Sequence, residues 1–264
     1  MKNAIGVFDS GVGGLTVARE IMRQLPNETI YYFGDVKNCP YGDKTKDEII
    51  KNTEKAIEFL INQGVKIIIL ACNTATAAAL EYLQDKYSLP IIGVVQPGAR
   101  RAIQATENNK VLVLGTQFTA ASQVYDREIE NINSDIQVYD KACPSFCPFI
   151  EAEGNLIEGA TKKLLDTELS DTKLLDMDTV VLGCTHYPIL KKDIEEYYEN
   201  NIKVISSGHE AARDVSTVLG YAKLLQKKLN KTEHKFFISK ESEHFNNIAS
   251  KWLKHTIKAE VVDI

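Results

Sequence analysis

The sequence predicts an α/β protein in which two similar lobes each contain a doubly wound parallel sheet. Short β-branched runs alternate with helix-length segments along the whole chain, which is typical of parallel sheets covered by helices on both faces. Runs such as Ile67–Leu70 and Val111–Leu114 are apolar throughout, as expected for strands buried on both faces. The length of 264 residues favours two domains over a single core.

The expected elements follow one another in a regular order. Helix-length segments include Lys46–Asn62, Ala75–Lys86 and Glu210–Lys228. Strands are expected wherever a short β-branched or aromatic run occurs between such segments. These runs are Ala4–Phe8, Thr29–Phe33, Lys66–Leu70, Ile91–Val94, Lys110–Leu114, Ile136–Tyr139, Thr179–Leu182, Lys203–Ile205, Lys235–Ile238 and Glu260–Val262.

A faint internal repeat relates the two lobes. Ile5–Ser10 resembles Val111–Thr116, since each is a strand followed by a hydroxyl residue. Ile68–Thr74 resembles Val180–His186, since each is a strand followed by a small residue, a Cys and polar side chains. The repeat predicts two lobes that each offer one Cys at the end of a strand.

The lobe boundaries are expected at two breaks, Gln96–Gly98 and Ser206–Gly208, where Pro, Ser and Gly interrupt the pattern. Lobe one then comprises residues 1–96 and 209–264, and lobe two comprises residues 97–208. The second lobe is thus inserted into the sequence of the first.

Composition and charge exclude several classes of protein. Hydrophobic residues make up 44% and charged residues 25% of the chain, which is ordinary for a globular protein. The net charge of −5 argues against nucleic-acid and anionic-membrane partners. The apolar run Ile67–Cys72 ends at Asn73, too short for a membrane span. The start, Met1–Asn3, gives no signal peptide, so we expect a cytoplasmic protein.

The cysteines do not form a recognisable disulfide or metal framework. Their number is odd and their spacings are scattered. Cys143 and Cys147 form a C-x3-C pair, but no second His/Cys pair lies nearby at zinc spacing, so we expect no metal site there. The five cysteines are Cys39, Cys72, Cys143, Cys147 and Cys184.

Three strand ends carry polar or reactive side chains, and ligands of open parallel sheets bind outside such ends. They are Asp9–Gly14, Cys72–Thr74 and Cys184–Pro188. The first is Gly-rich, but Thr16 stands where a dinucleotide-binding motif needs its third Gly, and the Lys of a phosphate-binding loop is absent. We expect a tight turn into a helix whose N–H groups face an anion such as a carboxylate.

Cys72 and Cys184 each follow a buried strand and precede an expected helix start, where a thiolate is favoured. A single Cys in this position is usually a small buried hydrophobe, but two in matching positions suggest a pair of facing thiols. One thiolate would take a proton from a carbon, and the opposite thiol would return a proton to the other face. The product would be the mirror image of the substrate.

Polar neighbours of the two thiols support this interpretation. Asn73, Thr74 and Thr185 are suited to bind a carboxylate or an ammonium group. We expect Asp9 to orient or tune one Cys and His186 the other, because an acid or an imidazole beside a thiol shifts its pKa and can shuttle its proton.

Several segments together resemble one enzyme family. The sequence is similar to the glutamate racemases of the aspartate/glutamate racemase family, and the FDSGVGG and GCTHYP segments together make the resemblance specific. It covers essentially the whole chain. The matching segments are Ile5–Val17, Tyr32–Gly42, Ala71–Ala75, Gln96–Ala99, Ala142–Glu151 and Leu182–Pro188, with a looser match at Ser206–Val215.

The resemblance implies a cofactor-independent enzyme that interconverts L- and D-glutamate without PLP or metal, with its active site in the cleft between the two lobes. Cys72 and Cys184 would be the acid/base pair, and Glu151 matches a position near the second Cys. The product would feed bacterial peptidoglycan synthesis, and a homodimer is expected. Substrate contacts are implied for Asp9, Ser10, Tyr41, Gly42, Asn73, Thr74, Thr185 and His186.

Departures and alternatives remain. Cys147 stands where the family usually has an aliphatic residue, and we do not expect it to touch the chemistry. The nearest alternative is an aspartate racemase, but those enzymes usually carry an acidic residue where His186 stands. The Gly spacing counts against a nucleotide-dependent oxidoreductase. A non-enzymatic amino-acid-binding protein of two lobes would need neither thiol.

Overall fold

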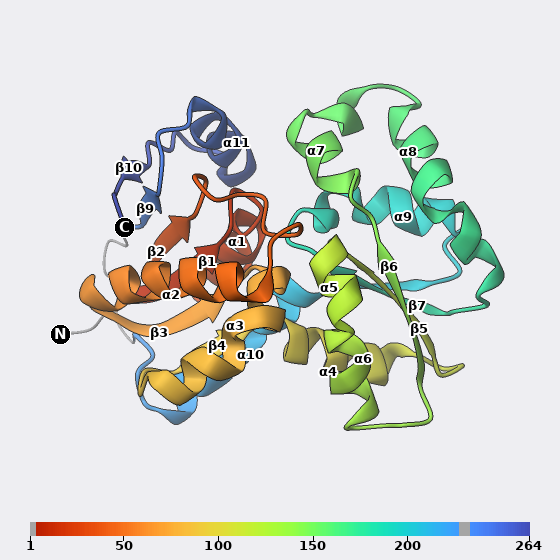
Figure 1. Ribbon diagram of the computed structural model, residues 1–264, viewed down its shortest axis with the longest axis horizontal. Coiled ribbons are helices and arrows are strands. Elements are labelled where there is room, and N and C mark those ends of the chain that lie inside the picture. Colours follow the sequence, from red (N-terminus) through yellow and green to blue (C-terminus); the bar gives the residue numbers. More distant parts are fainter. Residues whose placement is uncertain (1–3, 227–232) are drawn as a thin grey trace. The chain divides into compact units, whose positions relative to one another are not determined.

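The computed structural model describes residues 4–226 and 233–264, and the chain forms two compact units (Figure 1). Unit 1 comprises Met1–Val94 and Gly208–Ile264, and unit 2 comprises Val95–Ser207. The expected lobe boundaries lie one or two residues further along the chain at each crossing. No helix among the described residues is long and apolar enough to cross a membrane.

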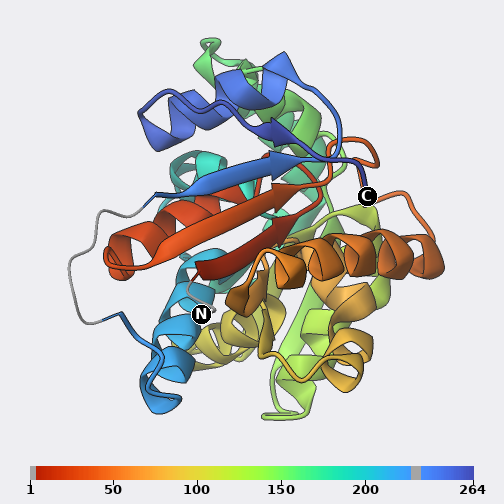
Figure 2. The ribbon, with the colours of Figure 1, turned by 90° about the vertical axis from the view of Figure 1, so that its left-hand side faces the viewer.

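Unit 1 is built on a parallel sheet that, in the described residues, has six strands in the order β10-β9-β2-β1-β3-β4. β9 pairs with β2, so the C-terminal part of the chain returns to the sheet that the N-terminus begins (Figure 2). The strands are β1 Ala4–Asp9, β2 Thr29–Gly34, β3 Val65–Leu70, β4 Ile91–Gly93, β9 Lys235–Ile238 and β10 Glu260–Val261.

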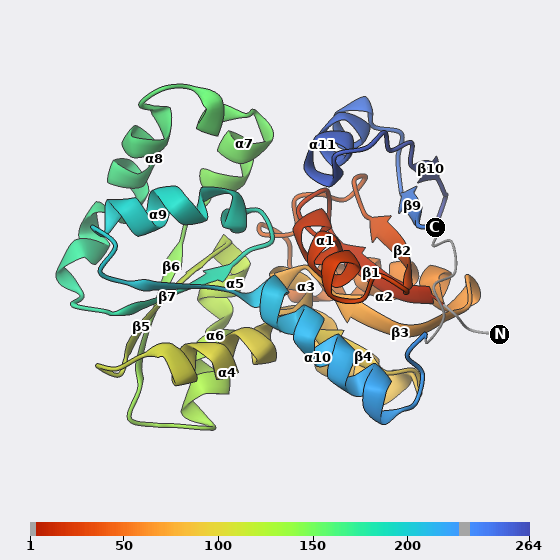
Figure 3. The ribbon, with the colours of Figure 1, turned by 180° about the vertical axis from the view of Figure 1, so that it is seen from behind.

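Helices cover both faces of this sheet, because its central strands are apolar on both sides. α2 and α3 lie on the face seen in Figure 1, and α1 and α10 lie on the opposite face, seen in Figure 3. Ile5, Val7 and Ile69 pack with apolar residues of α1, α10 and α11 in one buried cluster. The helices are α1 Leu15–Gln24, α2 Lys46–Asn62, α3 Asn73–Lys86, α10 Ser207–Tyr221 and α11 Glu243–Leu253.

Unit 2 contains a smaller parallel sheet with the strand order β6-β5-β7-β8. Its strands are β5 Lys110–Gly115, β6 Gln137–Ala142, β7 Thr179–Gly183 and β8 Lys203–Ser206. Its α-helices are α4 Val95–Ala105, α5 Gln117–Ser122, α6 Val124–Glu130, α7 Phe146–Glu151, α8 Ala160–Leu169 and α9 Lys191–Tyr197, and its 3₁₀ helices are η1 Gly154–Leu156, η2 Ser170–Leu174 and η3 Tyr187–Leu190.

The internal repeat corresponds to a shared topology. The order β2-β1-β3-β4 in unit 1 has the same form as β6-β5-β7-β8 in unit 2. β1 therefore corresponds to β5, and β3 corresponds to β7. Because β1 and β3 are parallel neighbours, with Phe8 opposite Leu70, the residues that follow these two strands come together at one edge of the sheet.

Two details of the predicted elements are wrong. The break at Gln96–Gly98 does not interrupt the helical structure but lies in the first turn of α4, because Pro97 is tolerated where a helix has no use for its N–H. The break at Ser206–Gly208 spans the end of β8 and the start of α10. α10 ends at Tyr221 and not at Lys228, which lies outside the described residues. Lys223 has a φ of 58°, and the Leu224 N–H bonds to the Leu219 carbonyl at 2.8 Å, a geometry that ends helices.

Candidate active site

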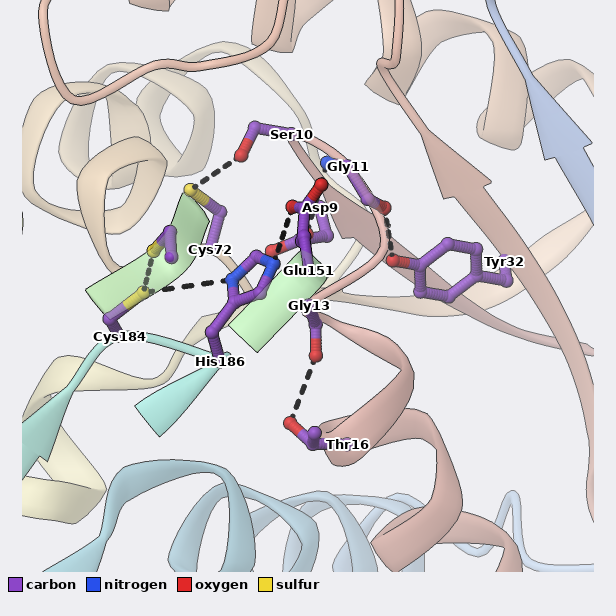
Figure 4. Close-up of polar contacts among 11 residues, drawn as sticks. Asp9, Ser10, Gly11, Gly13, Thr16, Tyr32, Cys72, Glu151, Cys184 and His186 are labelled. Carbon is purple, nitrogen blue, oxygen red and sulfur yellow. Dashed lines mark hydrogen bonds and ion pairs between the residues drawn. The ribbon is translucent and has the colours of Figure 1, made fainter. Parts of the chain in front are cut away.

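The Gly-rich turn after β1 holds Asp9 and Ser10 at the carboxyl end of the unit 1 sheet (Figure 4). Asp9 is buried, and its Oδ1 accepts a hydrogen bond from the Gly11 N–H at 3.0 Å. The Tyr32 hydroxyl donates to the Gly11 carbonyl at 2.7 Å, which ties the turn to β2. A Cβ at Gly14 would lie 2.4 Å from the Asp9 Cβ, so only glycine lets the start of α1 approach Asp9 this closely.

Local hydrogen bonds stabilise this turn and the start of α1. The Gly11 N–H bonds to Asp9, the Leu15 N–H bonds to the Val12 carbonyl at 3.1 Å, and the Thr16 N–H bonds to the Gly13 carbonyl at 3.0 Å. The Gly11 N–H thus faces the carboxylate of the chain's own Asp9, while Leu15 and Thr16 already belong to α1. That other N–H groups of the turn bind an anionic ligand stays a prediction.

Cys72 occupies the N-cap of α3, just beyond the end of β3. Its Sγ accepts a hydrogen bond from the Ala75 N–H at 3.4 Å, and its thiol donates to Ser10 Oγ at 3.6 Å. A helix N-terminus favours negative charge on the sulfur. Asn73 and Thr74, the first two residues of α3, are buried beside it. The structure thus brings together the unit 1 candidates that follow β1 and β3.

Tyr41 and Gly42 lie in the connection between β2 and α2. The buried Tyr41 hydroxyl donates to Asp35 Oδ2 at 2.6 Å, and Asp35 Oδ1 accepts from Ser239 Oγ at 2.7 Å. Burial, together with the Asp35 carboxylate, raises the pKa of Tyr41 far above its ordinary value, so the hydroxyl keeps its proton. Sequence reasoning missed Asp35, because its role depends on Ser239, 204 residues away.

In unit 2, the polar and reactive side chains Cys184, Thr185 and His186 follow the end of β7. All three are buried. The helix expected directly after Cys184 is wrong: the Tyr187 N–H bonds to the Cys184 carbonyl at 3.2 Å in a turn, and the chain continues as η3. The chain is an α-helix again only from Lys191, the first residue of α9.

His186 links Cys184 to Glu151 (Figure 4). Its Nδ1 lies 3.9 Å from Cys184 Sγ, and its Nε2 lies 2.8 Å from Glu151 Oε1, at the end of α7. Burial lowers the pKa of His186, but the hydrogen bonds to Cys184 and Glu151 outweigh burial and raise it to about 10. At neutral pH this arrangement favours an imidazolium between two anions, the thiolate and the carboxylate.

Cys147 contacts the same sulfur. Its Sγ lies 3.5 Å from Cys184 Sγ. The Cys147 hydrogen bond, followed by the contacts of His186, holds the pKa of the Cys184 thiol well below its usual range, although burial opposes this effect. The expectation that Cys147 does not touch the chemistry is therefore wrong. Cys147 and Glu151 are four residues apart and share one face of α7, but this spacing does not show which residue of unit 2 that face meets.

Each unit thus presents a buried thiol after corresponding strands, β3 and β7, with polar side chains beside it. Cys72 is supported by a backbone N–H and Ser10, and Cys184 is supported by Cys147 and the His186–Glu151 pair. A thiolate that is held in this way can accept a proton, and its thiol form can return one.

Comparisons with known proteins identify the family of the chain. The model of a family described as Asp/Glu/Hydantoin racemase matches residues 5–215. A glutamate racemase from Staphylococcus haemolyticus is 45% identical over 264 residues, which cover 100% of this chain and 99% of that protein.

Solved structures resemble the chain over nearly its full length. The crystal structure of a glutamate racemase from Bacillus anthracis has a TM-score of 0.96 and 39% identity, and the match covers 100% of this chain and 99% of that one. The glutamate racemase from Francisella tularensis, solved in complex with D-glutamate, has a TM-score of 0.92 and 34% identity, covering 99% of this chain and 98% of that one.

Proposed function

Because the chain belongs to the Asp/Glu/Hydantoin racemase family, we propose that it is a glutamate racemase that interconverts L- and D-glutamate by a two-base mechanism. One observation carries the mechanism: a buried thiol follows each of the corresponding strands β3 and β7. One of these thiols also lies beside a His–Glu pair. The assignment of glutamate as the substrate rests on the relatives that carry the name glutamate racemase.

In the proposed reaction, one thiolate removes the α-proton of glutamate and becomes a thiol. The electron pair left on the α-carbon is delocalised into the adjacent carboxylate, and the other thiol delivers its own proton to the opposite face. The second Cys ends as a thiolate, so the protein is ready for the reverse reaction or for proton exchange with water. Cys184 and Cys72 fill these two roles, which exchange when the other enantiomer is the substrate.

The surroundings of Cys184 suit this task. A free cysteine is only a few per cent thiolate at pH 7. Cys147 and His186 lower the pKa of Cys184, so a larger share of this thiol is ionised before substrate arrives. Since each thiol can act as both acid and base, we propose that the reaction needs neither PLP nor a metal ion.

The residues around the two thiols are proposed to bind the substrate. Because the Tyr41 hydroxyl is held by Asp35, we propose that Tyr41 and Gly42 contribute backbone groups. The supply of D-glutamate for peptidoglycan, the cytoplasmic location, the homodimer and the lack of a nucleic-acid partner stay predictions. The proposed substrate contacts are Asp9, Ser10, Tyr41, Gly42, Asn73, Thr74, Thr185 and His186.

The test is racemisation in D2O by protein freed of metal and PLP. L-glutamate should yield D-glutamate with deuterium at the α-carbon, measured by chiral chromatography and mass spectrometry, while L-aspartate should remain unchanged. Cys72→Ala and Cys184→Ala should each abolish turnover, whereas Cys143→Ala, which removes another buried thiol, should not. Turnover of aspartate but not of glutamate would show that the protein is an aspartate racemase instead. Near-full activity of either Cys72→Ala or Cys184→Ala would refute the two-base mechanism.

A further inference from the structure

Three possible metal ligands converge in unit 2. Among the described residues, Cys147 Sγ, Cys184 Sγ and one ring nitrogen of His186 all lie within 4.8 Å of one another. Neither the family resemblance nor the proposed mechanism assigns a role to this cluster as a whole. We propose that it is a binding site for a thiophilic divalent cation of the Zn²⁺ type, and that the bound ion blocks racemisation.

The distances are close to those of a zinc site. Tetrahedral Zn²⁺ with Zn–S of about 2.3 Å and Zn–N of about 2.1 Å sets S···S near 3.8 Å and S···N near 3.6 Å. The two sulfurs lie 3.5 Å apart, and Cys184 Sγ lies 3.9 Å from His186 Nδ1. These two distances differ from the ideal values by about 0.3 Å each, and the distance from Cys147 Sγ to the ring nitrogen of His186 is within 4.8 Å.

The chemistry of the ligands also fits. Thiolate and imidazole are the donors that select Zn²⁺ over Mg²⁺ or Ca²⁺. His186 Nε2 is hydrogen-bonded to Glu151 Oε1 at 2.8 Å, which leaves Nδ1 on the side of Cys184. A metal-binding histidine usually has such a carboxylate on its other nitrogen, where it fixes the orientation of the ring.

The fold holds these groups on ordered elements. Cys184 and His186 come from the turn between β7 and η3, while Cys147 and Glu151 come from successive turns of α7. Cys184 and His186 are buried, whereas Cys147 is partly exposed, so the cluster reaches the surface at this ligand. Three protein ligands leave a fourth position for water, as in other open zinc sites.

Occupation of the site would stop proton transfer. The ion takes the electron pair of Cys184 Sγ, which can then no longer accept the α-proton of the substrate. Coordination displaces two protons, which pass to solvent. One is the proton shared by Cys184 and His186, and the other is the thiol proton of Cys147. The binding site stands on its own geometry, whereas its inhibitory effect rests on the proposed function.

Direct titration of the reduced full-length chain tests the site. Co²⁺ should bind with one equivalent and give a thiolate-to-metal charge-transfer band, and Zn²⁺ should compete with a chromophoric chelator. Cys147→Val removes one ligand and should weaken binding more than about 100-fold, and Glu151→Gln should weaken it about 10–100-fold. Cys143→Ala is the matched control and should bind like the wild type. Wild-type affinity in Cys147→Val, or the absence of a thiolate band, would overturn the proposal.

Racemisation assays at buffered concentrations of free Zn²⁺ test whether the bound ion inhibits the enzyme. The wild type should be inhibited and should recover on addition of EDTA. The half-inhibitory Zn²⁺ concentration of Cys147→Val, relative to its own metal-free rate, should rise by the same factor as its dissociation constant. Recovery with a thiol reductant but not with EDTA would indicate a Cys147–Cys184 disulfide and would overturn the proposal. Metal binding by a chain without any racemase activity would support the site and refute the proposed function.

Discussion

Replacing Glu151 by Gln should change the pH profile of racemisation more than its rate at neutral pH. Glu151 Oε1 accepts from His186 Nε2 at 2.8 Å, and Gln keeps an acceptor oxygen but removes the charge. A charge-assisted hydrogen bond contributes about 1.5–3 kcal/mol, against about 1 kcal/mol for a neutral one. The loss of about 1 kcal/mol should lower the pKa of the Cys184–His186 pair by about 0.5–1 pH unit.

The direction of this pKa shift follows from the charges around His186. Glu151 is among the groups that raise the pKa of His186 to about 10, so the loss of its charge lets the proton leave at lower pH. Without that proton, the thiolate faces the substrate carboxylates as an uncompensated negative charge. The alkaline limb of kcat/KM should therefore move to lower pH by about 0.5–1 unit, while kcat/KM at pH 7 should change less than about threefold.

The assay is the initial rate of D-glutamate formation between pH 6 and 10.5, measured with EDTA present. Glu158→Gln removes an exposed carboxylate from the same stretch of chain and serves as the control. An alkaline limb that stays in place or moves upward in Glu151→Gln would refute the role assigned to Glu151. The same shift in Glu158→Gln would show that net charge alone is responsible.

Three further predictions concern the support of the site and the stability of the fold. Asp35→Asn should raise KM for glutamate more than it lowers kcat and should cost about 1–3 kcal/mol in urea unfolding, because one buried acceptor of the Tyr41 and Ser239 hydroxyls is lost. Gly14→Ala should lower the free energy of unfolding by about 1–3 kcal/mol, since its Cβ would lie 2.4 Å from the Asp9 Cβ; unchanged stability would mean that the turn can relax. Burial, and to a lesser extent Asp126, raise the pKa of Asp140 from 3.8 to about 7, so this group binds its proton more tightly in the folded state and its contribution to the stability should fall as the pH rises from about 4 to 7. Asp140→Asn should therefore be more stable than the wild type at pH 8, by about 1–2 kcal/mol after allowance for partial exposure, and equally stable near pH 4. Parallel urea curves at the two pH values would show whether this difference is present.

The strands could be predicted from the sequence because burial on both faces leaves a direct trace in composition. Every expected strand is present, and all strand ends but one agree with the expected ones to within one residue; the exception is the run Ile136–Tyr139, which became β6 and extends to Ala142. The helix ends were harder to predict. α10 stops through a left-handed residue that is Lys223 and not glycine, so no residue type marked the end.

The site could be predicted only where its residues are close in the sequence or follow corresponding strands. Cys72 and Cys184 were found because they recur after matching apolar runs. Asp35 and Cys147 were missed, because their importance depends on contacts with distant residues. Cys147 meets Cys184 only when α7 packs against the turn after β7, and no local pattern reports that packing.

The two thiols differ in their support although they follow corresponding strands. Cys72 caps α3 and contacts Ser10, whereas Cys184 begins no α-helix and relies on Cys147 and His186. In the proposed reaction this asymmetry has a thermodynamic limit. The two enantiomers are equally stable in solution, so kcat/KM must be equal for both directions in every variant. A difference between the two thiols can therefore appear only in kcat and KM taken separately, and the enantiomer with the lower KM must also have the lower kcat. A substitution that acts through Cys184 alone, such as Glu151→Gln, should change the ratio of the two kcat values, and the ratio of the two KM values must then change by the same factor.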